Sequence, residues 1–218
     1  MGHIFIVGGA GGVARPLAKQ LTCQGHQVTS LHRKPEQAEL LKKLGATPVL
    51  GDLVKLESAD LAELMNGCDV VVFSAGAGGA GVELTTAIDG EGLETSVEAA
   101  KLAGIKRFLL VSAFPESIRG QEPVHHAFEH YMKIKKQADV YLAATDLDWV
   151  ILRPGTLSHD AGTAKINLGL AIPYGVVPRE DVAATLAELI EQPAVNRVIL
   201  ELTQGDTPVA EAVAKIAR

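Results

Sequence analysis

The 218-residue chain is long enough to bury a core without disulfides or metals, and its 47% hydrophobic and 21% charged residues are ordinary for a globular protein. Its formal net charge of -6 argues against a nonspecific nucleic-acid binder, which would need clustered lysine and arginine. No signal peptide, bilayer-spanning apolar run or Cys-x-x-Cys spacing is recognisable, so we expect a cytoplasmic protein that binds no membrane.

Short apolar runs alternate with longer helical patterns along almost the whole chain. The expected strands are Ile4–Val7, Val28–Leu31, Pro48–Leu50, Val70–Phe73, Phe108–Val111, Trp149–Leu152 and Val198–Leu202. The expected helices are Ala14–Cys23, Pro35–Leu44, Ser58–Met65, Thr86–Ala103, Phe128–Ala144, Asp181–Glu191 and Asp206–Ala217. Ser58 and Asp60 are candidate caps of the third helix. Because strands in continuous apolar runs are usually covered on both faces, the pattern predicts one α/β domain over residues 1–218, a Rossmann-type doubly wound parallel sheet with helices on both faces.

Residues 156–178 interrupt this alternation. Their helix signals are weak, and the stretch is rich in glycine and proline, with Gly162, Gly169, Pro173 and Gly175 among them. Ligands of open α/β sheets bind beyond the carboxyl ends of the strands. We therefore expect a small, irregular, substrate-side segment that closes over these ends.

The first strand runs directly into a glycine-rich junction with the spacing Gly8-x-x-Gly11-x-x-Ala14. Gly8 permits a tight turn, Gly11 lets the backbone approach phosphates, and the small Ala14 lets the helix pack close to the strand. The start of the helix adds amide donors and the positive end of its dipole. We predict that this junction holds the pyrophosphate of a dinucleotide. The predicted contacts are Gly8, Gly9, Ala10, Gly11, Gly12 and Val13.

The end of the second strand selects between the two nicotinamide cofactors. An acidic residue there would bond the free ribose hydroxyls and repel a 2′-phosphate, but this chain reads Leu31-His32-Arg33-Lys34 with no acid until Glu36. Arg33 can pair with a 2′-phosphate and stack beside the adenine, with His32 or Lys34 adding positive charge. NADP(H) is therefore predicted over NAD(H). A solvated basic loop is the alternative.

Two further strand ends complete the predicted cofactor site. Asp52 and Leu53 follow the third strand, where the carboxylate could accept from the adenine amino group and the leucine could cover the ring. A simple turn aspartate is the alternative for Asp52. Ala75 and Gly76 follow the fourth strand, and such small residues let the ribose and nicotinamide come close.

Tyr131 and Lys135 are four residues apart in a strongly helical stretch, so they project from one face of the helix. Other motifs accompany them in a specific order: the glycine junction, Ser112 at the end of the fifth strand, Arg153-Pro154-Gly155 after the sixth, and Arg179-Glu180-Asp181-Val182-Ala183. Over nearly its whole length the chain resembles the short-chain dehydrogenase/reductase superfamily, in its atypical, epimerase-like NAD(P)-binding branch.

That resemblance implies a chemistry. The superfamily uses the tyrosine as general acid or base at the carbonyl or alcohol oxygen, and a phenol with a pKa of ~10 becomes a base at neutral pH only beside a cation. Lys135 would supply that charge and bond the nicotinamide ribose, while Ser112 would hold the substrate oxygen. Pro154 and Gly155 would present backbone to the nicotinamide carboxamide. Arg153 could form a structural ion pair, for example with Asp181.

Three functions fit these residues. The first is an NADP(H)-dependent oxidoreductase that moves hydride between nicotinamide and a small carbonyl, alcohol or conjugated acceptor. The second is a flavin- or biliverdin-type reductase that does not use Tyr131, since Ser112-Ala113-Phe114 is also similar to the pattern of such enzymes. The third is an NADP(H)-binding sensor without turnover. The substrate and the oligomeric state remain open.

A metal site and a nucleic-acid partner are not expected. His126 and His130 share a helical face, but no further grouping with ligand spacing completes a zinc site, and hydride transfer needs no metal. His125 and His159 are candidate substrate contacts instead. No aromatic interleaving suggests DNA or RNA binding, so the expected partner is a small-molecule substrate.

Overall fold

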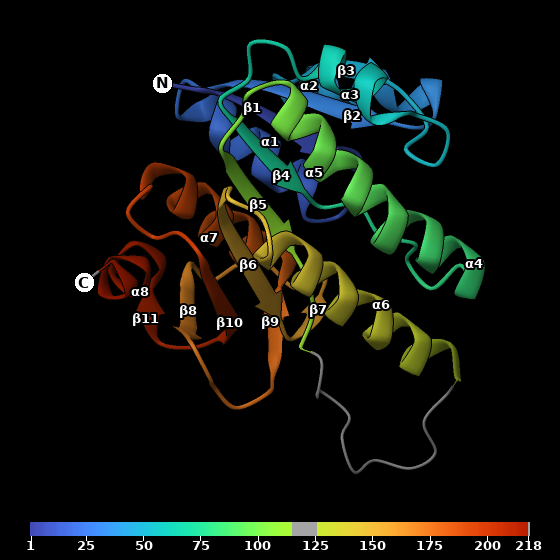
Figure 1. Ribbon diagram of the computed structural model, residues 1–218. Helices are drawn as coiled ribbons and strands as arrows, with labels where there is room; N and C mark the ends of the chain where they lie inside the picture. Colours follow the sequence, from blue (N-terminus) through green and yellow to red (C-terminus); the bar gives the residue numbers. More distant parts are fainter. Residues whose placement is uncertain (115–125, 218) are drawn as a thin grey trace.

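The computed structural model describes residues 1–114 and 126–217. Within these residues, a nine-stranded sheet has the order β11-β8-β10-β6-β5-β4-β1-β2-β3, and β7 pairs with β9 in a separate two-stranded sheet (Figure 1). The strands of the large sheet are β1 (His3–Val7), β2 (Gln27–His32), β3 (Thr47–Leu50), β4 (Val70–Phe73), β5 (Arg107–Val111), β6 (Asp148–Pro154), β8 (Lys165–Gly169), β10 (Val198–Gln204) and β11 (Thr207–Pro208). The small sheet comprises β7 (Thr156–Ser158) and β9 (Val176–Pro178).

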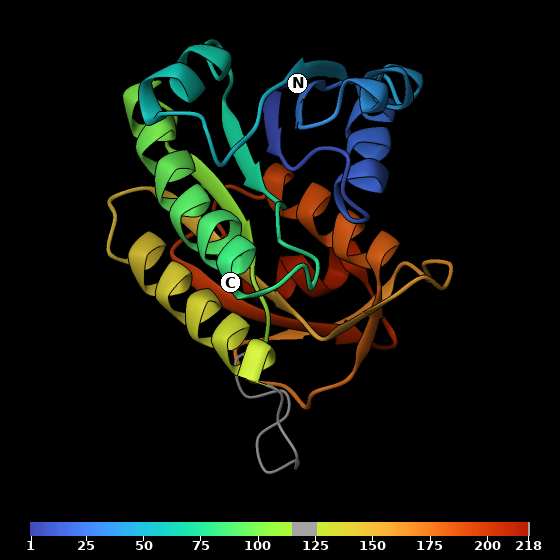
Figure 2. The same ribbon diagram turned by 90° about the vertical axis from the view of Figure 1, so that its right-hand side faces the viewer.

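Helices cover both faces of the large sheet. They are α1 (Ala14–Cys23), α2 (Ala38–Lys43), α3 (Ser58–Leu64), α4 (Val82–Thr85), α5 (Gly92–Leu102), α6 (His126–Ala143), α7 (Arg179–Glu191) and α8 (Val209–Ile216), with a 3₁₀ turn η1 (Pro35–Gln37) and a π-helical turn η2 (Thr86–Glu91). Figure 2 shows α5 and α6 on one side of the sheet and α1 and α7 on the other. Within the described residues, no helix combines the length and apolar character that crossing a membrane requires.

Successive side chains of a strand point to opposite faces of the sheet, and because both faces are buried, the central strands have unbroken apolar sequences. In β1, Ile4 and Ile6 pack into a cluster with side chains of α1, α7 and α8, whereas Phe5 and Val7 pack into a second cluster with α3, α5 and α6. These four side chains each have an exposed fraction of 0%. Each face of the pleat therefore needs its own apolar layer. The predicted doubly wound α/β sheet of the Rossmann type is confirmed.

Residues 156–178 are more regular than we expected, and the expectation of an irregular segment is wrong. β8 enters the large sheet antiparallel to both β10 and β11, and Ile166 at its centre has an exposed fraction of 0%. Its apolar alternation covers only Ile166 and Leu168, and the strands that pair with it follow much later in the chain. A pattern this short does not distinguish a strand from a loop.

Several expected helix ends also need correction. Ser58 is the first residue of α3 rather than its cap, because Glu57 is the N-cap, with extended backbone and no side-chain capping bond. The last helix begins at Val209 rather than Asp206, since Thr207 and Pro208 pair with β8. The helix expected from Thr86 follows α4 without a break, and its first turn is the π-helical η2.

Candidate functional site

The candidate site lies at the topological switch point of the sheet, where the strand order reverses between β1 and β4. β1 pairs with β2 on one side and β4 on the other, and the chain leaves β1 toward one face of the sheet and β4 toward the opposite face. Such a switch point leaves a crevice at the carboxyl ends of the strands. Two cavities of about 280 and about 690 Å³ occur there and share Gly11, Ser74, Ala75 and Gly76 in their walls. We call them the first and second cavity; together they form one trench.

The glycine junction after β1 forms the floor between the two cavities. Gly8 has a φ of +79°, and a Cβ there would lie 2.6 Å from the Cα of Ala75. The N–H of Gly11 donates to the carbonyl oxygen of Gly8 at 2.9 Å, and a Cβ on Gly11 would lie 3.1 Å from that oxygen. A Cβ on Gly8 would therefore collide with the loop after β4, and a Cβ on Gly11 would crowd the turn, so glycine at both positions allows a compact junction. A compact backbone turn that leads into a helix N-terminus fits a dinucleotide pyrophosphate.

The remaining junction residues divide by role. Ala10 borders the first cavity, and Gly12 and Val13 border the second. Gly9 borders neither, because its N–H donates to the carbonyl oxygen of Leu31 at 2.8 Å and a Cβ would lie 2.5 Å from the Cβ of Ser30. Gly9 therefore allows the junction to pack against β2.

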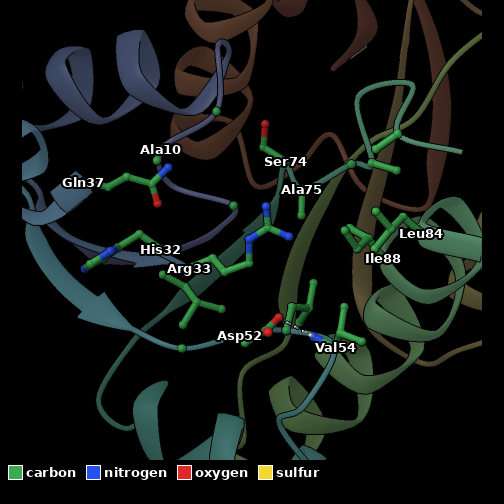
Figure 3. A pocket seen from close by; sticks show the side chains of 18 residues that line it. Ala10, His32, Arg33, Gln37, Asp52, Val54, Ser74, Ala75, Leu84 and Ile88 are labelled. Carbon is green, nitrogen blue, oxygen red and sulfur yellow. Dashed lines mark hydrogen bonds between the residues drawn. The ribbon is translucent and has the colours of Figure 1, made fainter. Parts of the chain in front are cut away.

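Arg33 extends from the end of β2 into the first cavity, as Figure 3 shows. Gln37 and Ala10 lie on one side of the guanidinium, and Leu84 and Ile88 lie across the cavity from them. Within the described residues, no ion pair neutralises Arg33. His32 is buried, with its Nδ1 in a 2.9 Å hydrogen bond with the carbonyl oxygen of Lys34, so it braces the turn.

Asp52 and Leu53 both border the first cavity. The N–H of Val54 donates to Oδ1 of Asp52 at 3.3 Å, and Lys55 Nζ lies 3.7 Å from Oδ2 (Figure 3 draws the first contact). These local contacts with Val54 and Lys55 are those expected of a turn aspartate, the alternative to an adenine contact for Asp52. The Leu53 side chain packs against Gly92, where a Cβ would lie 2.8 Å from its Cδ2.

Lys135 is buried in the wall of the second cavity. Its Nζ donates to the carbonyl oxygen of Val111 at 3.0 Å and to Oδ1 of Asp89 at 3.3 Å. The other Asp89 oxygen, Oδ2, accepts the N–H of Ala77 at 2.9 Å. Both ionised side chains are nearly inaccessible, with exposed fractions of 4% for Lys135 and 1% for Asp89. An ammonium has three donors, and within the described residues two of them are used, so one remains for a ligand.

Tyr131 borders the same cavity one turn before Lys135. Its ring centroid lies 5.9 Å from Lys135 Nζ and 6.1 Å from the centroid of Phe128. Burial raises the pKa of the Tyr131 phenol above its ordinary value; Lys135 lowers the pKa by less, and Asp89 and Asp139 raise it further. The expected net lowering of the Tyr131 pKa by Lys135 is therefore wrong, because the effect of burial exceeds that of Lys135 and the two carboxylates add to it. The phenol retains its proton at neutral pH.

Ser112 and Asp139 lie beneath the second cavity. Ser112 borders this cavity, but its hydroxyl is buried and, within the described residues, has no hydrogen-bond partner. Burial raises the pKa of the Asp139 carboxyl, and Ser112 and Arg153 partly offset this rise. Oδ2 of Asp139 accepts from Nε of Arg153 at 2.9 Å and lies 2.8 Å from its Nη2.

The ion pair suggested between Arg153 and Asp181 is not formed. Arg153 pairs with Asp139, whereas Asp181 accepts the N–H groups of Thr163 at 3.1 Å and Ala164 at 2.8 Å. Asp181 therefore anchors the chain before β8. In sequence both acids were equally available, and only the packing of α6 on β6 selects Asp139.

Pro154 and Gly155 border neither cavity. The N–H of Gly155 donates to the carbonyl oxygen of Leu202 at 2.9 Å, and a Cβ on Gly155 would overlap the carbonyl oxygen of Gly175. Gly155 thus brings the segment after β6 close to the chain before β9. The structure therefore does not place Pro154 and Gly155 in the cavity that Tyr131 and Lys135 border.

Arg179 and Asp89 are cavity residues to which the sequence assigned no role. Arg179 begins α7, and its Nη1 donates to the carbonyl oxygens of Leu157 at 3.1 Å and Ser158 at 2.9 Å. A Cβ on Gly12 would lie 2.8 Å from Cδ of Arg179, so the arginine packs directly on the glycine junction. No ion pair of Arg179 occurs in the described part of the chain. The sequence feature that could have pointed to Arg179 is its position after Pro178, at the start of the Arg179–Ala183 motif.

His130 and His159 do not border the second cavity. His130 Nε2 is 2.8 Å from Oγ1 of Thr86, which ties α6 to η2. His159 borders a third cavity of about 330 Å³ beside α1 and α2, which shares Gly12 and Arg179 with the second cavity. His125 lies outside the described residues. Among residues 1–114 and 126–217, no three His, Cys, Asp or Glu side chains gather in a way that could hold a metal.

Comparison with known proteins gives consistent results. The NAD(P)H-binding family model matches residues 8–193. The uncharacterized sugar epimerase YhfK of Bacillus subtilis (strain 168) is 36% identical over 216 residues, which cover 98% of this chain and 99% of that protein. A solved structure described as an NAD-dependent epimerase/dehydratase from Bacillus halodurans is 32% identical, with a TM-score of 0.90 and coverage of 99% and 100% of the two chains. ChuY, an anaerobilin reductase from Escherichia coli O157:H7, is 25% identical, with a TM-score of 0.80 and coverage of 94% and 98%.

Proposed function

Because the chain belongs to the NAD(P)H-binding family, we propose that it is an NADP(H)-dependent oxidoreductase that reduces a small carbonyl compound or conjugated acceptor. One observation carries the proposal: a single trench runs from Arg33, which has no ion pair among the described residues, across the glycine junction to Tyr131 and Lys135. A dinucleotide has this order of parts, with a phosphorylated ribose and adenine at one end and nicotinamide at the other.

Each part of the trench would hold one part of the cofactor. Arg33 would pair with the 2′-phosphate, and Asp52 and Leu53 would border the adenine. The junction from Gly8 to Val13 would hold the pyrophosphate, with the unpaired Arg179 packed on Gly12 as a further cation. Ala75 and Gly76 leave room for the nicotinamide ribose, and the remaining donor of Lys135 would bond its hydroxyls.

Tyr131 would act as the general acid. NADPH, held along the trench, would supply the hydride for the acceptor carbon. The Tyr131 phenol then donates its proton to the acceptor oxygen, and its raised pKa keeps that proton available at neutral and mildly alkaline pH. Ser112 borders the same cavity, and its buried hydroxyl has no hydrogen-bond partner in the described residues, so it would be available to bond the substrate oxygen after a rotation of its side chain.

The substrate would be largely apolar near its reactive group. Val111, Phe128 and Leu157 border the second cavity together with Tyr131. Leu157 lies on β7, so part of the segment over residues 156–178 contributes to this wall. We propose that this segment is the substrate side of a single domain spanning residues 1–218.

The likeness to an anaerobilin reductase supports a second candidate, a reductase of large conjugated acceptors that does not use Tyr131. An NADP(H)-binding sensor is the third. Turnover of NADPH with aldehydes, quinones, flavins and linear tetrapyrroles separates them. For the first candidate we expect turnover of a carbonyl acceptor that falls about 100-fold or more in Tyr131→Phe, with unchanged NADPH affinity.

Tyr141→Phe is the matched control. Tyr141 is on the same helix, but its hydroxyl donates to Glu98 at 2.9 Å outside both cavities, so the rate should stay within about twofold. The rate with wild-type protein should not fall between about pH 7 and pH 9, because the phenol loses its proton only above its raised pKa. Full turnover in Tyr131→Phe would favour the second candidate, and tight NADPH binding without turnover would favour the sensor.

A further inference from the structure

We propose that Asp89 is a positioning residue whose carboxylate fixes Lys135 and the loop after β4 in one arrangement and neutralises the charge that Lys135 presents to Tyr131. This inference rests on the proposed function, but its main test needs no turnover. The geometry of η2, the two oxygens of Asp89 and the surrounding charges each support it.

The π-helical turn η2 places Asp89 in the interior. π turns are rare, and they occur frequently at functional sites. The Asp89 side chain borders the second cavity with an exposed fraction of 1%. Thr86, at the start of this turn, bonds His130 of α6 at 2.8 Å, so the turn is attached to the helix that carries Tyr131 and Lys135.

Each oxygen of the Asp89 carboxylate has a separate partner. Oδ1 lies 3.3 Å from Lys135 Nζ, and Oδ2 accepts the N–H of Ala77 at 2.9 Å. A Cβ on Gly76 would lie 3.2 Å from Oδ1, so the loop after β4 lies directly against the carboxylate. One side chain therefore joins two walls of the cavity that would flank the nicotinamide ribose.

Both carboxylates and cations lie around Tyr131. Asp89 on η2 and Asp139 on α6 face it together with Lys135 on α6; Asp139 in turn pairs with Arg153 of β6, and Arg179 at the start of α7 borders the same cavity. His130 on α6 faces Thr86. Removing the negative charge of Asp89 while keeping its shape would leave Lys135 without its counter-ion, and an uncompensated cation favours the phenolate.

Asp89→Asn tests this step directly. The phenol of Tyr131 is titrated by its phenolate absorbance, and the same titration of Tyr131→Phe is subtracted to remove Tyr141 and Tyr174. We expect the pKa of Tyr131 to fall in Asp89→Asn. Glu91→Gln is the matched control, because it makes the same acid-to-amide change in the same turn at an exposed position, and it should leave the pKa unchanged.

A second readout is the affinity for NADPH. We expect Asp89→Asn to weaken binding about tenfold through the loss of a charged hydrogen bond, and Glu91→Gln to leave it unchanged. If Asp89→Asn does not fold, Asp89→Glu keeps the charge but displaces it, and binding should again weaken about tenfold. An unchanged pKa in folded Asp89→Asn, or wild-type affinity in Asp89→Glu, would overturn the proposal. Absent turnover would instead count against the proposed function alone.

Discussion

At the scale of single residues, α6 carries two buried charges on one face. Lys135 and Asp139 are four residues apart, and their side chains have exposed fractions of 4% and 3%. Each pairs with a residue from another element, Lys135 with Asp89 and Asp139 with Arg153. Desolvating such charges costs several kcal/mol, and apolar residues would pack here at lower cost. This arrangement is consistent with a functional requirement for these charges.

The Asp139–Arg153 pair gives a pH-dependent prediction. Burial already raises the pKa of Asp139, and Arg153→Met would raise it further by removing the cation. A folded-state pKa above the unfolded value means that protonation favours the folded state, so the loss of stability should be smaller at acid pH. We expect a loss of about 2 kcal/mol at pH ~8 and less at pH ~5.5, measured by urea unfolding.

The double variant Arg153→Met/Asp139→Asn is the control for that loss. Removing the unpaired carboxylate should recover part of the stability at pH ~8 and make it nearly independent of pH in this range. An equal loss at both pH values, with no recovery in the double variant, would mean that Arg153 stabilises the protein through packing alone.

At the scale of elements, the junction between β6 and β7 depends on close backbone contact. A Cβ on Gly155 would overlap the carbonyl oxygen of Gly175, whereas a Cβ on Gly175 would meet only the Thr203 side chain, at 3.4 Å and 3.5 Å. We expect Gly155→Ala to destabilise the fold by about 1–3 kcal/mol through overpacking, as measured by thermal or urea unfolding.

Gly175→Ala is the matched control for this contact. It adds the same methyl group on the facing segment at ordinary van der Waals distance, without a positive φ. Its stability should stay within about 0.5 kcal/mol of the wild type. Equal effects of the two substitutions would show that close packing between these segments does not set their separation.

At the scale of the whole molecule, local signals predicted the architecture well. β1 and β4 were recognisable because both faces of each strand are buried from Ile4 to Val7 and from Val70 to Phe73, and all residues of these two runs are apolar. β8 and β11 were not recognisable, since each is short and its pairing depends on partners far along the chain. The α7 helix was predicted as Asp181–Glu191, but its tie to the sheet was not: Arg107 of β5 donates to the carbonyl oxygen of Leu189 near the last turn of α7, at 2.7 Å.

The candidate site likewise contains residues that a local sequence pattern reveals and residues that only the fold brings together. The glycine junction and the Tyr131–Lys135 spacing are contiguous patterns, so the sequence alone identified them. Asp89 reaches Lys135 across 46 positions, and the contact depends on a π-helical turn that no local pattern signalled. The net direction of the Tyr131 pKa also escaped sequence reasoning, because it depends on burial and on carboxylates brought together by folding.

The central claim is that the whole trench holds NADPH with Arg33 at its phosphate end. The equilibrium dissociation constants of NADPH and NADH test it most directly, in the wild type, in Arg33→Ala and in Lys43→Ala, which removes an exposed cation that borders neither cavity. We predict at least about tenfold tighter binding of NADPH than NADH, lost in Arg33→Ala and kept in Lys43→Ala. Equal or tighter binding of NADH by the wild type, or an equal loss for both cofactors in Arg33→Ala, would contradict the account.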